Sequence, residues 1–90
     1  MLQVTEKATA FLWEAQHNRQ SRGMTYRLVE RPAGFGLAFD TTTTDDLIFT
    51  CEGLDVLCVS PTTAECASDL IIDLEETPKG RGLSFSVRHG

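Results

Sequence analysis

Three cysteines are the side chains of this sequence best suited to bind a metal or to react. Cys51, Cys58 and Cys66 are odd in number and have no Cys-x-x-Cys pair among them. If Cys51 pairs with Leu54 across a hairpin, Cys51 and Cys58 share one face of the sheet but lie roughly 13 Å apart, too far for a disulfide or a shared metal. We therefore interpret the three cysteines as structural free thiols, with Cys58 buried in an apolar run.

The other polar side chains form no pattern typical of a catalytic site. Two carboxylate pairs, residues 45–46 and 75–76, fall in predicted polar turns, whereas general acid catalysis needs a partly buried carboxyl. The serines have neither a nucleophile-elbow motif nor a plausible base partner. Two Gly-x-Gly segments, residues 34–36 and 80–82, lack the strand-loop-helix context of a phosphate site and are predicted turns. The chain is therefore not expected to be an enzyme.

Length and charge exclude several classes of function. Ninety residues fit one domain, residues 1–90, with one compact core. Thirteen acidic and eight basic residues give a net charge of -5, and the basic residues form no run, which argues against nucleic acid and membrane surfaces as partners. Because no apolar stretch could span a membrane and no signal peptide is visible, we expect a cytoplasmic protein.

Apolar periodicity predicts the elements that position these residues. A helix over residues 5–20 has Thr5 as its N-cap, and Ser60-Pro61 begins a second, short helix over residues 62–70. Alternating or short apolar segments predict strands. The predicted strands are residues 24–29, 37–39, 47–51, 54–59, 71–74 and 83–87. This order indicates an α+β domain with a largely antiparallel sheet.

The predicted core consists of the large apolar residues on the inner faces of these elements. Its members are Phe11, Leu12, Tyr26, Leu28, Phe39, Ile48, Phe49, Val56, Leu57, Val59, Leu70, Ile72, Leu83 and Phe85.

Several features, in their order along the chain, resemble the A-type (HesB/IscA-like) iron–sulfur cluster biosynthesis domain. They are the N-terminal helix, the Gly-Phe turn at residues 34–35, the acidic-Gly hairpin at 52–53, the Ser-Pro strand end at 60–61, and the segment 71–87. The resemblance covers nearly the whole chain and rests on order and spacing. It implies a HesB-like compact β-sandwich or mixed sheet with an N-terminal helix and a second short helix.

The resemblance also implies where a cluster would be held, and here the sequence departs from the family pattern. In that family one cysteine precedes a small residue, Gly and Phe in a loop, and two more form a Cys-Gly-Cys tail after the last strand. Pro32 stands at the first position, and residues 88–90 contain no cysteine. Clusters need converging thiolates, and proline offers no donor atom. The expectation is a degenerate member with no bound metal and no cofactor.

Two functions follow from the resemblance. The first is a non-ligating adaptor or target-binding module in iron–sulfur cluster assembly, with an assembly factor or an apo-target as its protein partner. The alternative is a stand-alone protein-interaction or structural module of the same fold outside that pathway. A homo-oligomer is compatible with both functions.

The resemblance places a candidate partner-binding loop at Pro32, Ala33, Gly34 and Phe35, beside the segment after Val87. Phe35 has two placements on such a turn. It either projects as an exposed anchor for a partner or folds inward and caps the sheet. The inward placement is favoured because isolated Phe side chains usually join the core.

Overall fold

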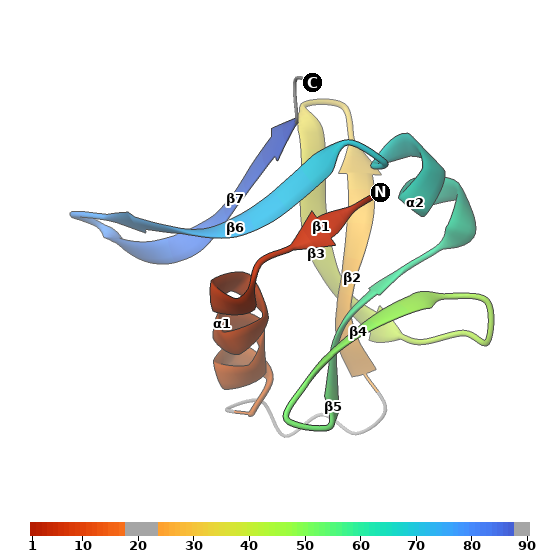
Figure 1. Cartoon of the computed structure of the whole chain (residues 1–90), viewed down its shortest axis with the longest axis horizontal. Coiled ribbons are helices and arrows are strands. Elements are labelled where there is room, and N and C mark those ends of the chain that lie inside the picture. The colour runs from red at the N-terminus through yellow and green to blue at the C-terminus, as the bar shows by residue number, and fades with distance from the viewer. Residues whose placement is uncertain (18–23, 88–90) are drawn as a thin grey trace.

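The computed structural model describes residues 1–17 and 24–87, which form two β-sheets and two helices (Figure 1). The elements are β1 (Gln3–Val4), α1 (Glu6–His17), β2 (Met24–Arg31), β3 (Gly34–Thr41), β4 (Leu47–Cys51), β5 (Leu54–Val59), α2 (Pro61–Cys66), β6 (Leu70–Thr77) and β7 (Gly80–Val87). One sheet has the strand order β1-β6-β7 and the other the order β3-β2-β5-β4. This is the predicted α+β class, with the N-terminal helix and the short second helix in place.

Two hairpins of the fold share a sequence pattern and a geometry. Residues 32–39 (PAGFGLAF) and 78–85 (PKGRGLSF) are identical at five of eight positions. Arg31 pairs with Gly34 in the first hairpin and Thr77 with Gly80 in the second, so each turn has two residues. Both glycines have positive φ, +133° at Gly34 and +130° at Gly80, a conformation that favours glycine. The β2–β3 and β6–β7 hairpins are therefore equivalent units.

Each hairpin is joined by a parallel strand from the other half of the chain. β1 pairs with β6 through Gln3 and Val4, and β5 pairs with β2 through Leu57 and Cys58. A helix follows each of these two strands, α1 after β1 and α2 after β5. The chain is thus two strand-helix-hairpin halves in which each half supplies a strand to the other.

Local capping signals fix where both helices begin. The Ala8 amide donates to Thr5 Oγ1 at 3.2 Å, and the Thr63 amide donates to Ser60 Oγ at 3.3 Å, as expected of N-caps. The Thr5 hydroxyl also donates to Asp73 at 2.7 Å and so ties α1 to β6. No helix within the described ranges has the length and apolar character needed to cross a membrane.

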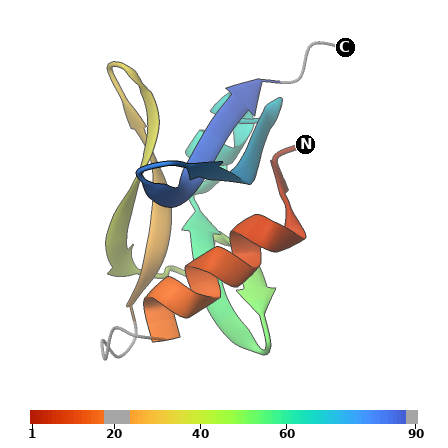
Figure 2. The same ribbon diagram turned by 90° about the vertical axis from the view of Figure 1, so that its left-hand side faces the viewer.

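The core lies between the sheets and against α1, which contacts β4, β5 and β6 (Figure 2). Half of the predicted core residues are buried and the rest are half-buried. Six of the half-buried ones lie on edge strands or on the open side of α1, and the seventh, Tyr26, lies on the inner strand β2. The buried ones are Leu12, Leu28, Val56, Leu57, Val59, Leu70 and Ile72. Four buried apolar residues of the described ranges were absent from that core list, namely Leu2, Ala8, Cys58 and Ala67.

Several predicted boundaries were wrong. Both Gly-x-Gly segments begin strands rather than forming turns, because the ladders close directly on two-residue turns at residues 32–33 and 78–79. β1 was missed, since two residues are too few to show a period. The second helix ends at Cys66, and the predicted helical residues 18–20 lie outside the described residues. The two parallel strand pairs also make the sheets mixed.

Leu57 provides a test of the core. Its side chain is fully excluded from solvent, so Leu57→Ala should lower the free energy of unfolding by about 2–5 kcal/mol. Leu47, which is 44% exposed on the neighbouring strand, is the matched control, and Leu47→Ala should change it by less than about 0.5 kcal/mol. Urea unfolding followed by circular dichroism measures both values, and equal losses would contradict the assignment.

Candidate functional site

The β2–β3 turn carries the candidate partner-binding loop. Pro32, Ala33 and Gly34 are all exposed at the end of the hairpin. Arg31 folds back over the hairpin, where its Nη2 donates to the Leu37 carbonyl at 3.4 Å and its side chain covers Gly36. A Cβ added at Gly36 would lie 2.5 Å from Arg31 Nε, so glycine leaves room for this arrangement. The turn is an accessible surface on a well-paired hairpin.

Phe35 belongs to the core side of this turn. Its side chain is half-buried and packs against the buried cluster, opposite Glu30 in the ladder. The inward placement of Phe35 therefore holds, and the exposed part of the loop is Pro32, Ala33 and Gly34. A large apolar anchor is not offered to a partner at this turn.

The C-terminal part of the expected face is only partly described. Val87, the last residue of β7, is 55% exposed, and the segment after it lies outside the described residues. The end of β7 and the β2–β3 turn point toward the same end of the molecule in both views, but Figure 2 separates them. The β2–β3 turn and the described end of β7 are therefore separate parts of the surface in Figure 2.

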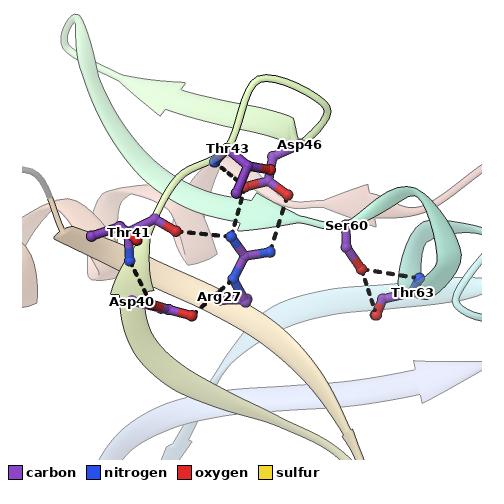
Figure 3. Close-up of polar contacts among 7 residues, drawn as sticks. All are labelled: Arg27, Asp40, Thr41, Thr43, Asp46, Ser60 and Thr63. Carbon is purple, nitrogen blue, oxygen red and sulfur yellow. Dashed lines mark hydrogen bonds and ion pairs between the residues drawn. The ribbon is translucent and has the colours of Figure 1, made fainter.

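A polar network covers the outer face of the four-stranded sheet (Figure 3). The Arg27 guanidinium donates to both Asp46 carboxylate oxygens, at 3.0 and 2.7 Å, and to the Thr41 carbonyl at 2.9 Å. The Thr43 amide donates to the same carboxylate at 2.7 Å. Since the Asp46 side chain is 1% exposed, this is a buried bidentate ion pair that holds the loop between β3 and β4 onto β2.

Cys58 lies beneath this ion pair. It is fully buried and neighbours Arg27 in the β2–β5 ladder. Burial raises the pKa of its thiol, which disfavours the thiolate that metals and electrophiles require. The structure confirms the prediction that Cys58 is a buried free thiol.

The predicted common face of Cys51 and Cys58 was wrong. The β4–β5 register shifts between Phe49 and Thr50, so that Cys51 pairs with Leu54 but Ile48 pairs with Cys58. This bulge turns Cys51 toward the core cluster, while Cys58 sits beside Arg27 on the opposite face.

Cys66 is exposed at the end of α2. A hydrogen bond with the Glu30 carboxylate raises the pKa of the Cys66 thiol above its usual value. The three cysteines thus occupy the core side of β4, the outer face of β5 and the surface of α2.

The donor atoms of the described residues do not suit an iron–sulfur cluster. Clusters are held by thiolates that converge on one point, and these three cysteines lie on separate surfaces. Among residues 1–17 and 24–87, no group of three or more His, Cys, Asp or Glu side chains could hold a metal ion. Pro32 contributes no donor to the exposed turn.

Two features of the structure were not predicted from sequence. Asp46 was interpreted as a solvated carboxylate, yet its side chain is buried. The local signal for this was the Thr-x-x-Asp spacing, which allows the Thr43 amide to donate a hydrogen bond to the Asp46 carboxylate. An apolar groove beside Phe11 and Trp13 was also missed. The available signal was Trp13, which lies next to the main apolar stripe of the helix.

Phe35→Ala should lower the free energy of unfolding by about 1.5–3 kcal/mol, because a half-buried aromatic side chain leaves the core. Arg81 occupies the equivalent position of the second hairpin and is exposed, so Arg81→Ala should cost less than about 0.5 kcal/mol. Thermal and urea unfolding of the two variants measures the difference. An unchanged stability of Phe35→Ala would place Phe35 outside the core.

The Arg27–Asp46 pair predicts a pH dependence. The hydrogen bonds from Arg27 lower the pKa of Asp46 from 3.8 to about 2. The pKa of Asp46 is lower in the folded chain than in the unfolded chain, so the ionised carboxylate stabilises the fold. This contribution to the free energy of unfolding is complete above about pH 4 and is lost as the pH falls toward 2, a decrease of about 2 kcal/mol.

Urea unfolding at about pH 6 and about pH 2.5 measures this loss. Asp46→Asn should remove most of that part of the pH dependence, whereas the exposed neighbour control Asp45→Asn should retain it. Identical pH profiles for the two variants would contradict the assignment to Asp46.

No family model matches the chain. No curated protein matches it either.

Solved structures are similar to this chain in backbone arrangement. SufA of Escherichia coli, described as involved in biosynthesis of iron–sulfur clusters, superposes with a TM-score of 0.70 at 22% identity over 96% of this chain and 84% of SufA. IscA with a [2Fe-2S] cluster gives 0.65 at 18% identity, covering 97% and 85%. A solution structure from Aquifex aeolicus gives 0.65 at 20% identity, covering 99% and 91%.

At these identities the similarity concerns the backbone arrangement. The two sheets, the N-terminal helix and the short second helix are aligned over nearly the whole chain. This chain therefore has the A-type, HesB/IscA-like fold of SufA and IscA.

Proposed function

We propose that this chain is a non-ligating protein of iron–sulfur cluster assembly that binds an assembly factor or an apo-target as a cytoplasmic adaptor. The proposal rests on one combination of observations. The chain has the A-type fold, but its β2–β3 turn, Pro32-Ala33, contains no cysteine that could bind a cluster. SufA is described as involved in iron–sulfur cluster biosynthesis, and IscA was solved with a [2Fe-2S] cluster. The protein-binding surface of such a domain can be kept when its ligands are lost.

The state of the cysteines supports the non-ligating part of the proposal. Cluster binding requires thiolates, and the pKa values of both Cys58 and Cys66 are raised, by burial and by Glu30 respectively. Cys51 faces the core cluster, away from the β2–β3 turn. Bringing these thiols to one iron site would require the sheet and α2 to come apart.

The polar side chains support a binding function rather than catalysis. Ser60 caps α2, and Ser84 Oγ donates to the Asp73 carbonyl at 3.4 Å, so both hydroxyls are used in the fold. Asp46 is held as a carboxylate by Arg27, and the remaining carboxylate neighbours Glu75 and Glu76 are exposed on the hairpin. General acid or base catalysis needs a positioned group with a pKa near neutrality.

The second candidate is an interaction module of the same fold outside this pathway. Its supporting observation is the absence of any matching family model despite the similarity in structure. The two candidates differ in what the chain does to a cluster-transfer reaction, which allows one experiment to separate them.

The test has two readouts on the purified chain. Anaerobic incubation with ferrous iron, sulfide and a reducing thiol should leave no stoichiometric iron and no visible charge-transfer absorption, because the thiols do not converge. The chain is then added to a mixture of IscA loaded with a [2Fe-2S] cluster and an apo-ferredoxin, and the rate at which the ferredoxin gains a cluster is followed. An adaptor that binds both proteins should raise the transfer rate about tenfold or more through effective concentration, whereas a module that binds only one of them should compete with the other protein and lower the rate.

Matched variants locate the surface. Ala33→Glu changes the exposed β2–β3 turn and should abolish the acceleration, whereas Lys79→Glu at the equivalent position of the β6–β7 turn should retain it. Stoichiometric iron that disappears in Cys66→Ser or Cys58→Ser would overturn the non-ligating proposal. An unchanged transfer rate would overturn the adaptor function in favour of the second candidate.

A further inference from the structure

The two sheets end in four edge strands within the described ranges, and three of these edges are protected against pairing with another chain. β1 has only two residues. β4 has a bulge between Phe49 and Thr50. β7 has Arg81 on the face toward α1, where it pairs with Glu14 at 3.7 Å. Short edges, bulges and inward-pointing charges are the devices that stop a sheet from adding a foreign strand.

β3 has none of these three devices. Its eight residues pair with β2 without a bulge, and no Lys, Arg or Pro stands among residues 34–41. Its inner row, Phe35, Leu37 and Phe39, is apolar, and no described strand pairs with its other side (Figure 2). A long, regular, apolar edge is the kind of strand to which an extended peptide can be added.

The register of the hairpin determines which backbone groups of β3 point outward. A two-residue turn closes on a hydrogen-bonded pair, here Arg31 and Gly34, and bonded and non-bonded pairs alternate along an antiparallel ladder. Leu37, which lies opposite Leu28, is three pairs further on and belongs to a non-bonded pair. Its amide and carbonyl, like those of Phe35, therefore point away from β2. This edge presents the donors and acceptors that a further strand would bind.

The Arg31 side chain lies across this edge. It passes over Gly36, and its Nη2 donates to the outward Leu37 carbonyl at 3.4 Å, in an exposed and long hydrogen bond. A carboxylate is a stronger acceptor for a guanidinium than a carbonyl is, so an acidic side chain beside the edge would displace this contact. The second hairpin has no such cover, because a Cβ added at Gly82 would meet no atom of the described residues within 4 Å.

An apolar cleft of ≈ 310 Å³ lies beside the inner face of β3. Leu37 lines it from β3, Leu83 and Phe85 line it from β7, and Phe11 lines it from α1. Every second side chain of a strand added to β3 would point to the same side as Leu37, toward this cleft. In strand addition the main-chain hydrogen bonds give affinity, and pockets for alternate side chains give specificity. β3 offers both.

We propose that the β3 edge binds an extended segment of a partner protein as an added antiparallel strand. Alternate apolar side chains of that segment enter the cleft beside Leu37, and a carboxylate on its outer face replaces the Leu37 carbonyl as the partner of Arg31. Asp40, the charged residue within β3, is already paired with Arg27 at 3.5 Å, so Arg31 determines the charge that this edge prefers. The proposal does not depend on the iron–sulfur pathway, because it states how a peptide is held and not which protein supplies it.

The probe is a blocked peptide of about eight residues, the length of β3, in which valine alternates with threonine and a central threonine is replaced by glutamate. N-methyl groups on the threonine and glutamate amides leave one edge able to pair, which keeps the peptide from stacking into sheets. At about 1 mM it should slow amide hydrogen exchange at Phe35 and Leu37 at least about tenfold, which corresponds to a Kd of about 100 μM or tighter.

The matched control peptide carries its N-methyl groups on the valines instead. In an antiparallel pair, the residues that bond to Leu37 are those whose side chains share its face, which are the valines. The control peptide has lost these donors and should leave the exchange rates at Phe35 and Leu37 unchanged.

Arg31 provides a second test, of charge. The parent chain should bind the glutamate probe at least about fivefold more tightly than a probe with lysine in its place. Arg31→Glu should reverse this preference. Arg81→Glu, which changes an exposed arginine of the second hairpin, should retain the preference of the parent chain. Circular dichroism confirms that both variants are folded.

Several outcomes would contradict the proposal. Unchanged exchange at Phe35 and Leu37 in the presence of the probe overturns strand addition, and so does binding of the control peptide as tightly as the probe. A preference for glutamate that survives Arg31→Glu overturns the role of Arg31. If exchange at Phe35 and Leu37 slows as the parent chain alone is concentrated, a second copy occupies the edge, which also overturns the proposal.

Discussion

The burial of β5 on both faces is the constraint on which the rest of the structure depends. All four residues from Val56 to Val59 are fully excluded from solvent, although β5 is in a small domain with few layers. The core and α1 cover one face. The other face is covered by the Arg27–Asp46 pair and the loop it holds. A strand that is buried on both faces must be packed against other residues on each face. In β5 one face packs against apolar side chains and the other against an ion pair.

The polar cover has an energetic consequence. A buried ion pair recovers its desolvation cost only when its geometry is good and its remaining donors and acceptors are satisfied. Arg27 meets this condition with a bidentate contact and a backbone carbonyl, and Asp46 with an added amide. Removal of one partner alone would leave the other charged in a buried position. The loop between β3 and β4, which lacks apolar anchors of its own, is therefore ordered by one arginine.

Sequence was sufficient for the features that depend on near neighbours. The caps at Thr5 and Ser60 and the stripe that buries Leu12 are local signals, and with the strand runs they gave the α+β class. Features set by distant partners could not be predicted. β1 exists because β6 is available to pair with it, and the bulge that separates Cys51 from Cys58 depends on packing.

The candidate site shows the same division. The β2–β3 turn could be located through a resemblance, and the inward placement of Phe35 followed from its apolar character. The groove at Trp13 requires four elements, α1, β4, β6 and β7, to be positioned relative to one another, and no local pattern encodes that arrangement. The residues that line it lie on α1, β6, β7 and the end of the β4–β5 hairpin, which are far apart in sequence.

The exchange of parallel strands between the two halves affects how the chain can fold during synthesis. β1 is synthesised before the other described strands, yet its ladder partners are Ile71 and Ile72 of β6. During translation β1 therefore has no ladder partner until β6 has been synthesised. Contacts this distant in sequence raise the contact order and slow folding. Until they form, apolar segments such as residues 56–59 of β5 are exposed and can bind chaperones. A nascent chain truncated before β6 has every strand of the β3-β2-β5-β4 sheet, but it lacks the ladder partner of β1 and the core side chains Leu70 and Ile72. The three-stranded sheet and the shared core can therefore form only late in synthesis.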